Sequence, residues 1–123
     1  MILADANIWI DFFRSGKPGM RELLERNQVI MHPHLVAELA LGSLRDRAST
    51  LARLDHMRQA QVVLLQDVRR MIEARTLYST GIGLTDAHLV ASCLAAPGTL
   101  LWTSDARLGK VADVLGIRAN LPC

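Results

Sequence analysis

The sequence predicts a three-layer α/β/α protein with a central, mostly parallel sheet. Short apolar runs of strand length alternate along the chain with longer segments in which apolar residues recur at helical spacing. Proline and glycine mark the boundaries of several segments, as Pro33 and Gly42 do for one predicted helix. Strands that alternate with helices in this way form a parallel sheet covered on both faces.

Local patterns justify each element of the first half. The apolar residues 1–4 predict a buried strand, and 7–14 place apolar residues at helical spacing, with Asn7 suited to cap the start. Residues 16–27 continue as a helix, because Pro18 is tolerated in a first turn. The next elements are a short buried strand over 28–32, a helix over 33–42 and an exposed amphipathic helix over 45–59.

The second half repeats the alternation. Valine and leucine at 60–65 predict a third strand, and an amphipathic helix over 67–79 ends before the glycines at 81 and 83. Residues 85–96 are apolar on nearly all sides, which predicts a buried helix. The remaining elements are a strand over 99–104, a helix over 105–116 and a last edge strand over 117–121.

Length and composition predict one domain, residues 1–123, because half of the residues are hydrophobic and can form a substantial core. The chain has no apolar run of about 18 residues and no signal-peptide pattern at its start, so we expect a cytoplasmic protein without a membrane span. Cys93 and Cys123 form neither a disulfide framework nor a zinc site. The net charge of +2 does not by itself predict nucleic-acid binding, although all but two of the 14 basic residues are arginine, which suits phosphate contacts.

Four acidic residues differ from the others in their position. Two follow predicted strands, at the edge where an open parallel sheet presents its site; one begins the buried helix, and one lies on a mainly apolar helix. Taken singly, a turn, a helix cap or the helix dipole would explain most of them. Their coincidence at one sheet edge favours a shared site. This acidic quartet consists of Asp5, Glu38, Asp86 and Asp105.

Converging carboxylates repel one another and take up protons unless a cation is present. Oxygen ligands without cysteine or well-placed histidine suit Mg²⁺ or Mn²⁺. Such an ion activates water and neutralises the charge that develops during phosphoryl transfer. The quartet therefore predicts metal-dependent phosphodiester hydrolysis without a protein nucleophile.

Four stretches resemble PIN-domain ribonucleases in their order and spacing, and in particular the toxins of VapBC-type toxin–antitoxin pairs. They are LADANIWID, HPHLVAELALG, GIGLTDAHLVAS and LWTSDARL, and the resemblance covers nearly the whole chain. The resemblance implies that the acidic quartet is catalytic and holds Mg²⁺ or Mn²⁺, and that Asn7, Thr103 and Ser104 are supporting polar residues. One departure is the stretch MHPH before Glu38, where many relatives have serine or threonine.

The same resemblance implies function and partners. Family members are typically endoribonucleases that cut structured RNA, often tRNA or ribosomal RNA. They commonly form homodimers, and a VapB-type antitoxin blocks the site, often by inserting a basic side chain.

Basic and aromatic residues have less specific interpretations. Arg107, two residues after Asp105, is the candidate substrate contact, although a solvated helix arginine is the alternative. The histidines at 32 and 34 favour a strand-end turn over a metal site, and His88 is expected in the core or an interface. We expect Trp9 and Trp102 in the core or at dimer contacts. A basic rim is predicted from Arg14, Lys17, Arg45, Arg47, Arg107 and Lys110.

Two other functional classes remain open. A catalytically silent PIN-like module would only bind a protein partner. A receiver-type phosphoacceptor domain would also place acids and Mg²⁺ at a parallel sheet, but it needs an acid pair after the first strand. Here Ala6 follows Asp5, and Lys110 lies inside a predicted helix.

Overall fold

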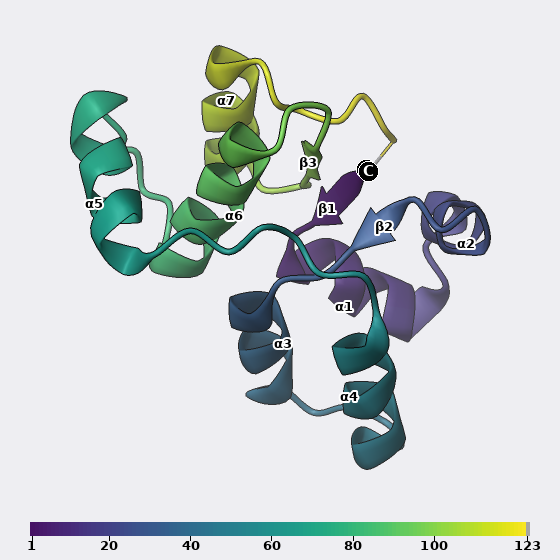
Figure 1. Ribbon diagram of the computed structural model, residues 1–123. Helices are drawn as coiled ribbons and strands as arrows, with labels where there is room; N and C mark the ends of the chain where they lie inside the picture. Colours follow the sequence, from purple (N-terminus) through teal and green to yellow (C-terminus); the bar gives the residue numbers. More distant parts are fainter. Residues whose placement is uncertain (123) are drawn as a thin grey trace.

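The computed structural model describes residues 1–122 and has a short parallel sheet at its centre, with helices on both sides (Figure 1). Strand β1 lies between the other two, in the order β2-β1-β3. Ile2 is in register with Val29 on one side and with Leu100 on the other. The predicted α/β class is therefore confirmed. The strands are β1 (Ile2–Ala4), β2 (Val29–Ile30) and β3 (Leu100–Trp102).

The described residues contain seven helices, which follow the sequence pattern to within a few residues. Pro18 and Pro33 occupy first turns, where the missing N–H costs nothing. Gly16 ends the first helix in the left-handed region, with φ of 66°, and its N–H donates to the Phe12 carbonyl. The helices are α1 (Ala6–Ser15), α2 (Pro18–Glu25), α3 (Pro33–Ala40), α4 (Arg47–His56), α5 (Leu65–Ala74), α6 (Leu84–Ala95) and α7 (Ala106–Leu115).

The predicted strand over 60–65 is wrong. Gln59 makes a single parallel bridge to Met31, and the chain then runs without regular structure until α5 begins at Leu65. The Gln61 carbonyl accepts a hydrogen bond from the Ser92 hydroxyl rather than from a strand (2.6 Å). Val62 and Leu65 are about half exposed, and only Ala60 and Val63 of this run pack against the core.

The predicted edge strand over 117–121 is reduced to one parallel bridge between Leu101 and Arg118. The Leu101 N–H donates to the Ile117 carbonyl, and the Ala119 N–H donates to the Leu101 carbonyl. These two bonds extend the sheet beyond β3 without forming a strand.

The core surrounds the sheet and includes one face of most helices. Helix α6 is buried from Ala87 to Cys93, as its uniformly apolar sequence predicts, while α5 packs on its outer side (Figure 1). Trp9 and Trp102 are both core residues. Cys123 lies outside the described residues. In residues 1–122, no helix is both long and apolar enough to cross a membrane.

Candidate active site

Two members of the acidic quartet begin helices at the carboxyl ends of neighbouring strands. Asp5 follows β1 and caps α1, with Oδ1 accepting the Ile8 N–H at 3.1 Å. Asp105 is separated from β3 by two residues and caps α7, with Oδ1 accepting the N–H groups of Arg107 and Leu108 at 2.8 and 3.0 Å. Since β1 and β3 are adjacent and parallel, both carboxylates lie at the same edge of the sheet.

The predicted cap at Asn7 is wrong, because α1 begins at Ala6 and Asp5 is its N-cap. Asn7 lies in the first turn with its side chain exposed. Burial raises the pKa of Asp5, and the Asn7 backbone N–H is the smallest of the hydrogen bonds that oppose this rise.

Thr103 connects the two capping acids. Its buried hydroxyl donates to Asp5 Oδ2 and accepts the backbone N–H of Asp105 at 3.0 Å. Both oxygens of Asp5 therefore accept a hydrogen bond, which fixes the orientation of the carboxylate. Ser104, the next residue, is exposed.

The other two members of the quartet come from α3 and α6. Glu38 is exposed on α3, and Asp86 is partly buried in the first turn of α6. Burial, together with the negative charges of the other three acids, raises the pKa of Asp86 to about 6, while the Gly83 backbone N–H opposes the rise. The four carboxylates are therefore near enough to interact electrostatically.

The chemistry of these donors fits a hard divalent cation, because all four acids supply oxygen ligands. In residues 1–122, however, no three His, Cys, Asp or Glu side chains are already arranged to hold one ion. Mg²⁺ is usually held by one or two carboxylates together with waters and substrate phosphates. A pair of the quartet acids is enough to begin such a site.

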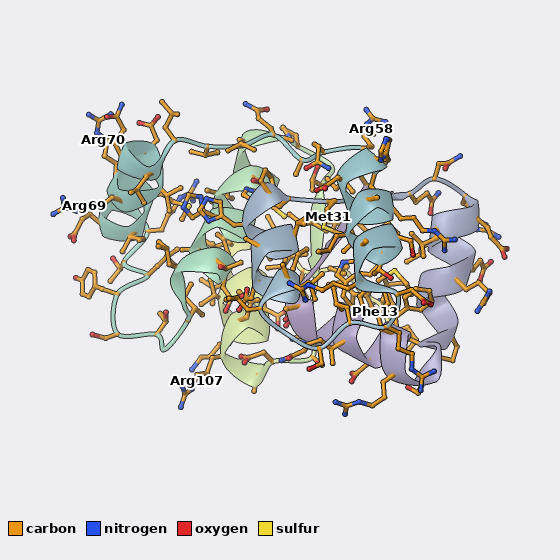
Figure 2. All side chains as sticks on the ribbon, turned by 90° about the horizontal axis from the view of Figure 1, so that it is seen from below. Phe13, Met31, Arg58, Arg69, Arg70 and Arg107 are labelled. Carbon is orange, nitrogen blue, oxygen red and sulfur yellow. The ribbon has the colours of Figure 1, made fainter. Side chains whose placement is uncertain are left out.

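Arg107 is exposed, and its side chain lies against Gly81 in the loop before α6. A Cβ added to Gly81 would lie 2.7 Å from Arg107 Cδ, so the side chain crosses the glycine closely. Figure 2 shows Arg107 extending from α7 at the edge of the molecule. The predicted rim is not continuous, because the Arg47 guanidinium instead donates to the Ala40 and Gly42 carbonyls at the end of α3.

A cluster of three histidines beside the acids was not predicted. The rings of His34 and His88 are stacked, with centroids 3.9 Å apart and planes 20° from parallel. The buried His32 ring lies 5.9 Å from that of His88, and burial lowers the pKa of His32 to about 4. A sequence signal existed: His34 and Glu38 are four residues apart, which places them on one face of α3.

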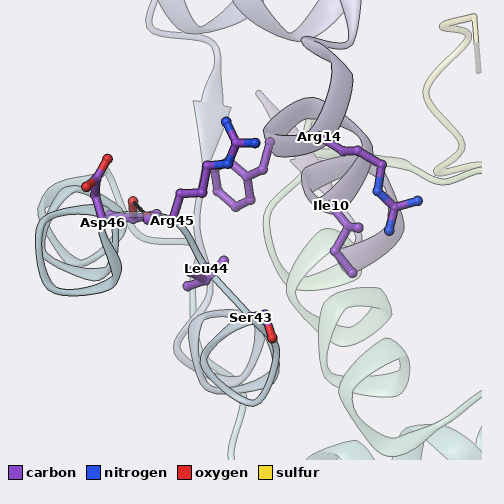
Figure 3. A pocket seen from close by; sticks show the side chains of 8 residues that line it. Ile10, Arg14, Ser43, Leu44, Arg45 and Asp46 are labelled. Atoms are coloured by element: carbon purple, nitrogen blue, oxygen red, sulfur yellow. Dashed lines mark hydrogen bonds between the residues drawn. The ribbon is translucent and has the colours of Figure 1, made fainter.

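A separate pocket of about 360 Å³ lies between α1 and the segment that joins α3 to α4 (Figure 3). Arg14 and Arg45 line it together with partly exposed Ile10 and Phe13, and no quartet acid belongs to its wall. These two arginines of the predicted rim therefore belong to a second surface feature.

Comparisons with a family model and with individual proteins agree with each other. Residues 2–114 match the family model described as PIN domain, and this range contains the whole acidic quartet. Two relatives named Ribonuclease VapC32, from Mycobacterium tuberculosis strains CDC 1551 / Oshkosh and ATCC 25618 / H37Rv, are each 38% identical over 117 residues. The alignment covers 95% of this chain and 94% of each relative.

Proposed function

Because the chain belongs to the PIN-domain family and is a VapC-type toxin endoribonuclease, we propose that it hydrolyses tRNA or ribosomal RNA with Mg²⁺ or Mn²⁺ held by its acidic quartet. The observation that most supports this assignment is the placement of Asp5 and Asp105 after the neighbouring parallel strands β1 and β3, where the Thr103 hydroxyl hydrogen-bonds to both residues. Carboxylates that lie close together repel one another, which is unfavourable when no cation is bound. A bound cation offsets their repulsion.

The residues of the chain have distinct parts in this mechanism. When bound, the divalent ion supplies a polarised water and a positive charge opposite the phosphate. Asp5 and Asp105 are oriented by backbone N–H groups, and Asp5 also by Thr103, so they lose little freedom when they bind an ion. Glu38 is exposed and Asp86 partly so, which leaves both accessible to water and substrate.

The decisive experiment is incubation of the purified, antitoxin-free chain with tRNA and ribosomal RNA in Mg²⁺, Mn²⁺ or EDTA. We expect a discrete cut that requires metal and disappears in Asp5→Asn. Because water rather than a ribose hydroxyl attacks the phosphorus, RNA with a 2′-deoxy nucleotide at the cut should still be cleaved. This outcome excludes a contaminating ribonuclease that uses the 2′-hydroxyl.

The matched control is Asp55→Asn, which neutralises an exposed acid on α4 and should leave cleavage unchanged. If folded wild-type protein cuts no RNA in either metal, the catalytically silent binding module becomes the better assignment.

We also propose that residues 1–123 form one PIN-like nuclease domain that acts in the cytoplasm, where its RNA substrates are. Its partner is a VapB-type antitoxin that places a basic side chain among the acids, which are the natural counter-charges for it. A homodimer is proposed through exposed apolar side chains on and beside α5, and light scattering tests its mass. These side chains are Val62, Leu64, Leu65, Tyr78 and Leu84.

A further inference from the structure

The contact between α3 and α6 has two neighbouring levels. At one level, the charge of Glu38 acts on Asp86, and at the other the ring of His34 stacks on that of His88. Four residues separate the two levels on α3, which corresponds to about 6 Å along the helix axis. His34 is therefore one helical turn from Glu38 on α3.

The position of His34 is fixed from two sides. Its backbone N–H donates to Nδ1 of His32, the N-cap of α3, at 3.0 Å. Its ring rests on His88, which is 2% exposed and is itself packed near His32. In residues 1–122 neither ring nitrogen of His88 has a hydrogen-bond partner, so the stack is not held by a side-chain hydrogen bond from His88. His34 nevertheless remains exposed.

The molecule thus presents an exposed, supported imidazole next to its acidic edge. Unstacked RNA bases bind by stacking on flat aromatic side chains, including histidine. An exposed ring that is already stacked on a buried one loses little freedom when a further planar group binds.

We propose that His34 is a stacking platform for a base of the RNA substrate, close to the phosphate that faces the acidic quartet. This inference rests on the proposed ribonuclease function and adds a substrate-binding residue to it. His34 lies about 6 Å along the α3 axis from Glu38, so the stacked base is expected near the cut.

The test uses oligo(U), whose bases stack little on one another, with one uridine replaced by fluorescent 2-aminopurine, bound to Asp86→Asn protein so that no cleavage interferes. Stacking on His34 should quench the fluorescence. His34→Leu should abolish the quench and weaken binding about 5- to 150-fold, whereas His34→Phe should retain both. In the cleaving enzyme the same fold-change should appear in KM.

The matched control is His56→Ala, which removes an exposed histidine on α4 and should change neither quench nor KM. The platform is refuted if His34→Leu leaves the quench intact, or if His34→Leu and His34→Phe lower affinity and melting temperature equally. If the protein cleaves RNA with metal but its KM does not change in His34→Leu, the stacking platform is refuted and the proposed ribonuclease function stands. A His34-dependent quench in a protein that cuts no RNA would support the platform and refute the proposed function.

Discussion

At the residue scale, Asp105 has two physical roles that one substitution can separate. Its carboxylate caps α7, and it is a proposed ligand of the metal. Asparagine caps a helix about as well as aspartate but removes the charge, whereas alanine removes both. We expect Asp105→Asn to abolish cleavage while the free energy of unfolding is maintained or increased, because one repelling charge is lost.

Asp105→Ala should abolish cleavage and also lower the free energy of unfolding by about 1 kcal/mol, the usual loss of an N-cap. Urea unfolding of both variants without metal, together with the RNA assay, measures the two effects. An Asp105→Asn protein that still cleaves would show that Asp105 acts only as a cap.

Thr103 shows how a predicted supporting residue acts through others. It is buried between the two capping acids and contacts both of them through one hydroxyl. Its hydrogen bond lowers the pKa of Asp5, opposing the rise caused by burial and by the charge of Asp105. Thr103 therefore favours the ionised form that a metal requires.

At the element scale, the loop before α6 depends on a glycine. Gly81 has φ of 85°, and a side chain there would meet Arg107. Gly81→Ala should lower the free energy of unfolding by about 1–2 kcal/mol, because side chains are disfavoured at this backbone angle, and should displace Arg107. Gly42→Ala, where a Cβ has only an ordinary contact at 3.5 Å and φ is not positive, is the control for urea unfolding.

A Gly81→Ala protein as stable as Gly42→Ala would contradict this account of the loop. If Arg107 contacts RNA, Gly81→Ala should in addition raise KM while the acids remain in place. An unchanged KM favours the solvated helix arginine considered from the sequence.

Sequence predicts elements well where the signal is local. Pro33 and the apolar residues of α6 define their helices without any tertiary information. The run at 60–65 misled the prediction because valine and leucine favour a strand locally, while only tertiary structure shows that Val62 and Leu64 are exposed. Because the carboxyl ends of parallel strands lie at the same edge of a sheet, the sequence also places Asp5 and Asp105 at one edge.

The parts of the site that sequence did not predict all depend on contacts between distant residues. The stack of His34 on His88 joins α3 to α6, and the hydrogen bond from Thr103 to Asp5 joins the residues that directly follow β3 and β1. The spacing of His88 from Asp86 alone indicates different helix faces, and nothing local shows that α3 supplies a partner for the histidine.

At the scale of the whole molecule, two groups respond to acid in opposite directions. The pKa of Asp86 is raised to about 6, so its stabilising contribution is present at low pH and is lost as the pH rises through about 6. The pKa of His32 is lowered from 6.5 to about 4, so its contribution is present above 6.5 and is lost as the pH falls through about 4. The two effects partly cancel in metal-free wild type.

The substitution Asp86→Asn removes the pH dependence of stability that comes from Asp86 and leaves the part that comes from His32. Because His32 contributes equally in both proteins, the stability of Asp86→Asn relative to wild type should decrease as the pH falls from about 6 to 3.8, the interval set by Asp86 alone. Urea unfolding in EDTA across this interval measures the difference, and Asp55→Asn is the control. Parallel stability curves for wild type and Asp86→Asn would contradict the raised pKa.

The capping role of two site acids has a genetic consequence. Codons for aspartate and asparagine differ by a single base, and asparagine keeps the helix cap. One mutation at Asp105 can therefore yield a folded chain that retains its surfaces but no longer harms its host. Catalytically silent copies of this chain should therefore arise in a single step and still fold.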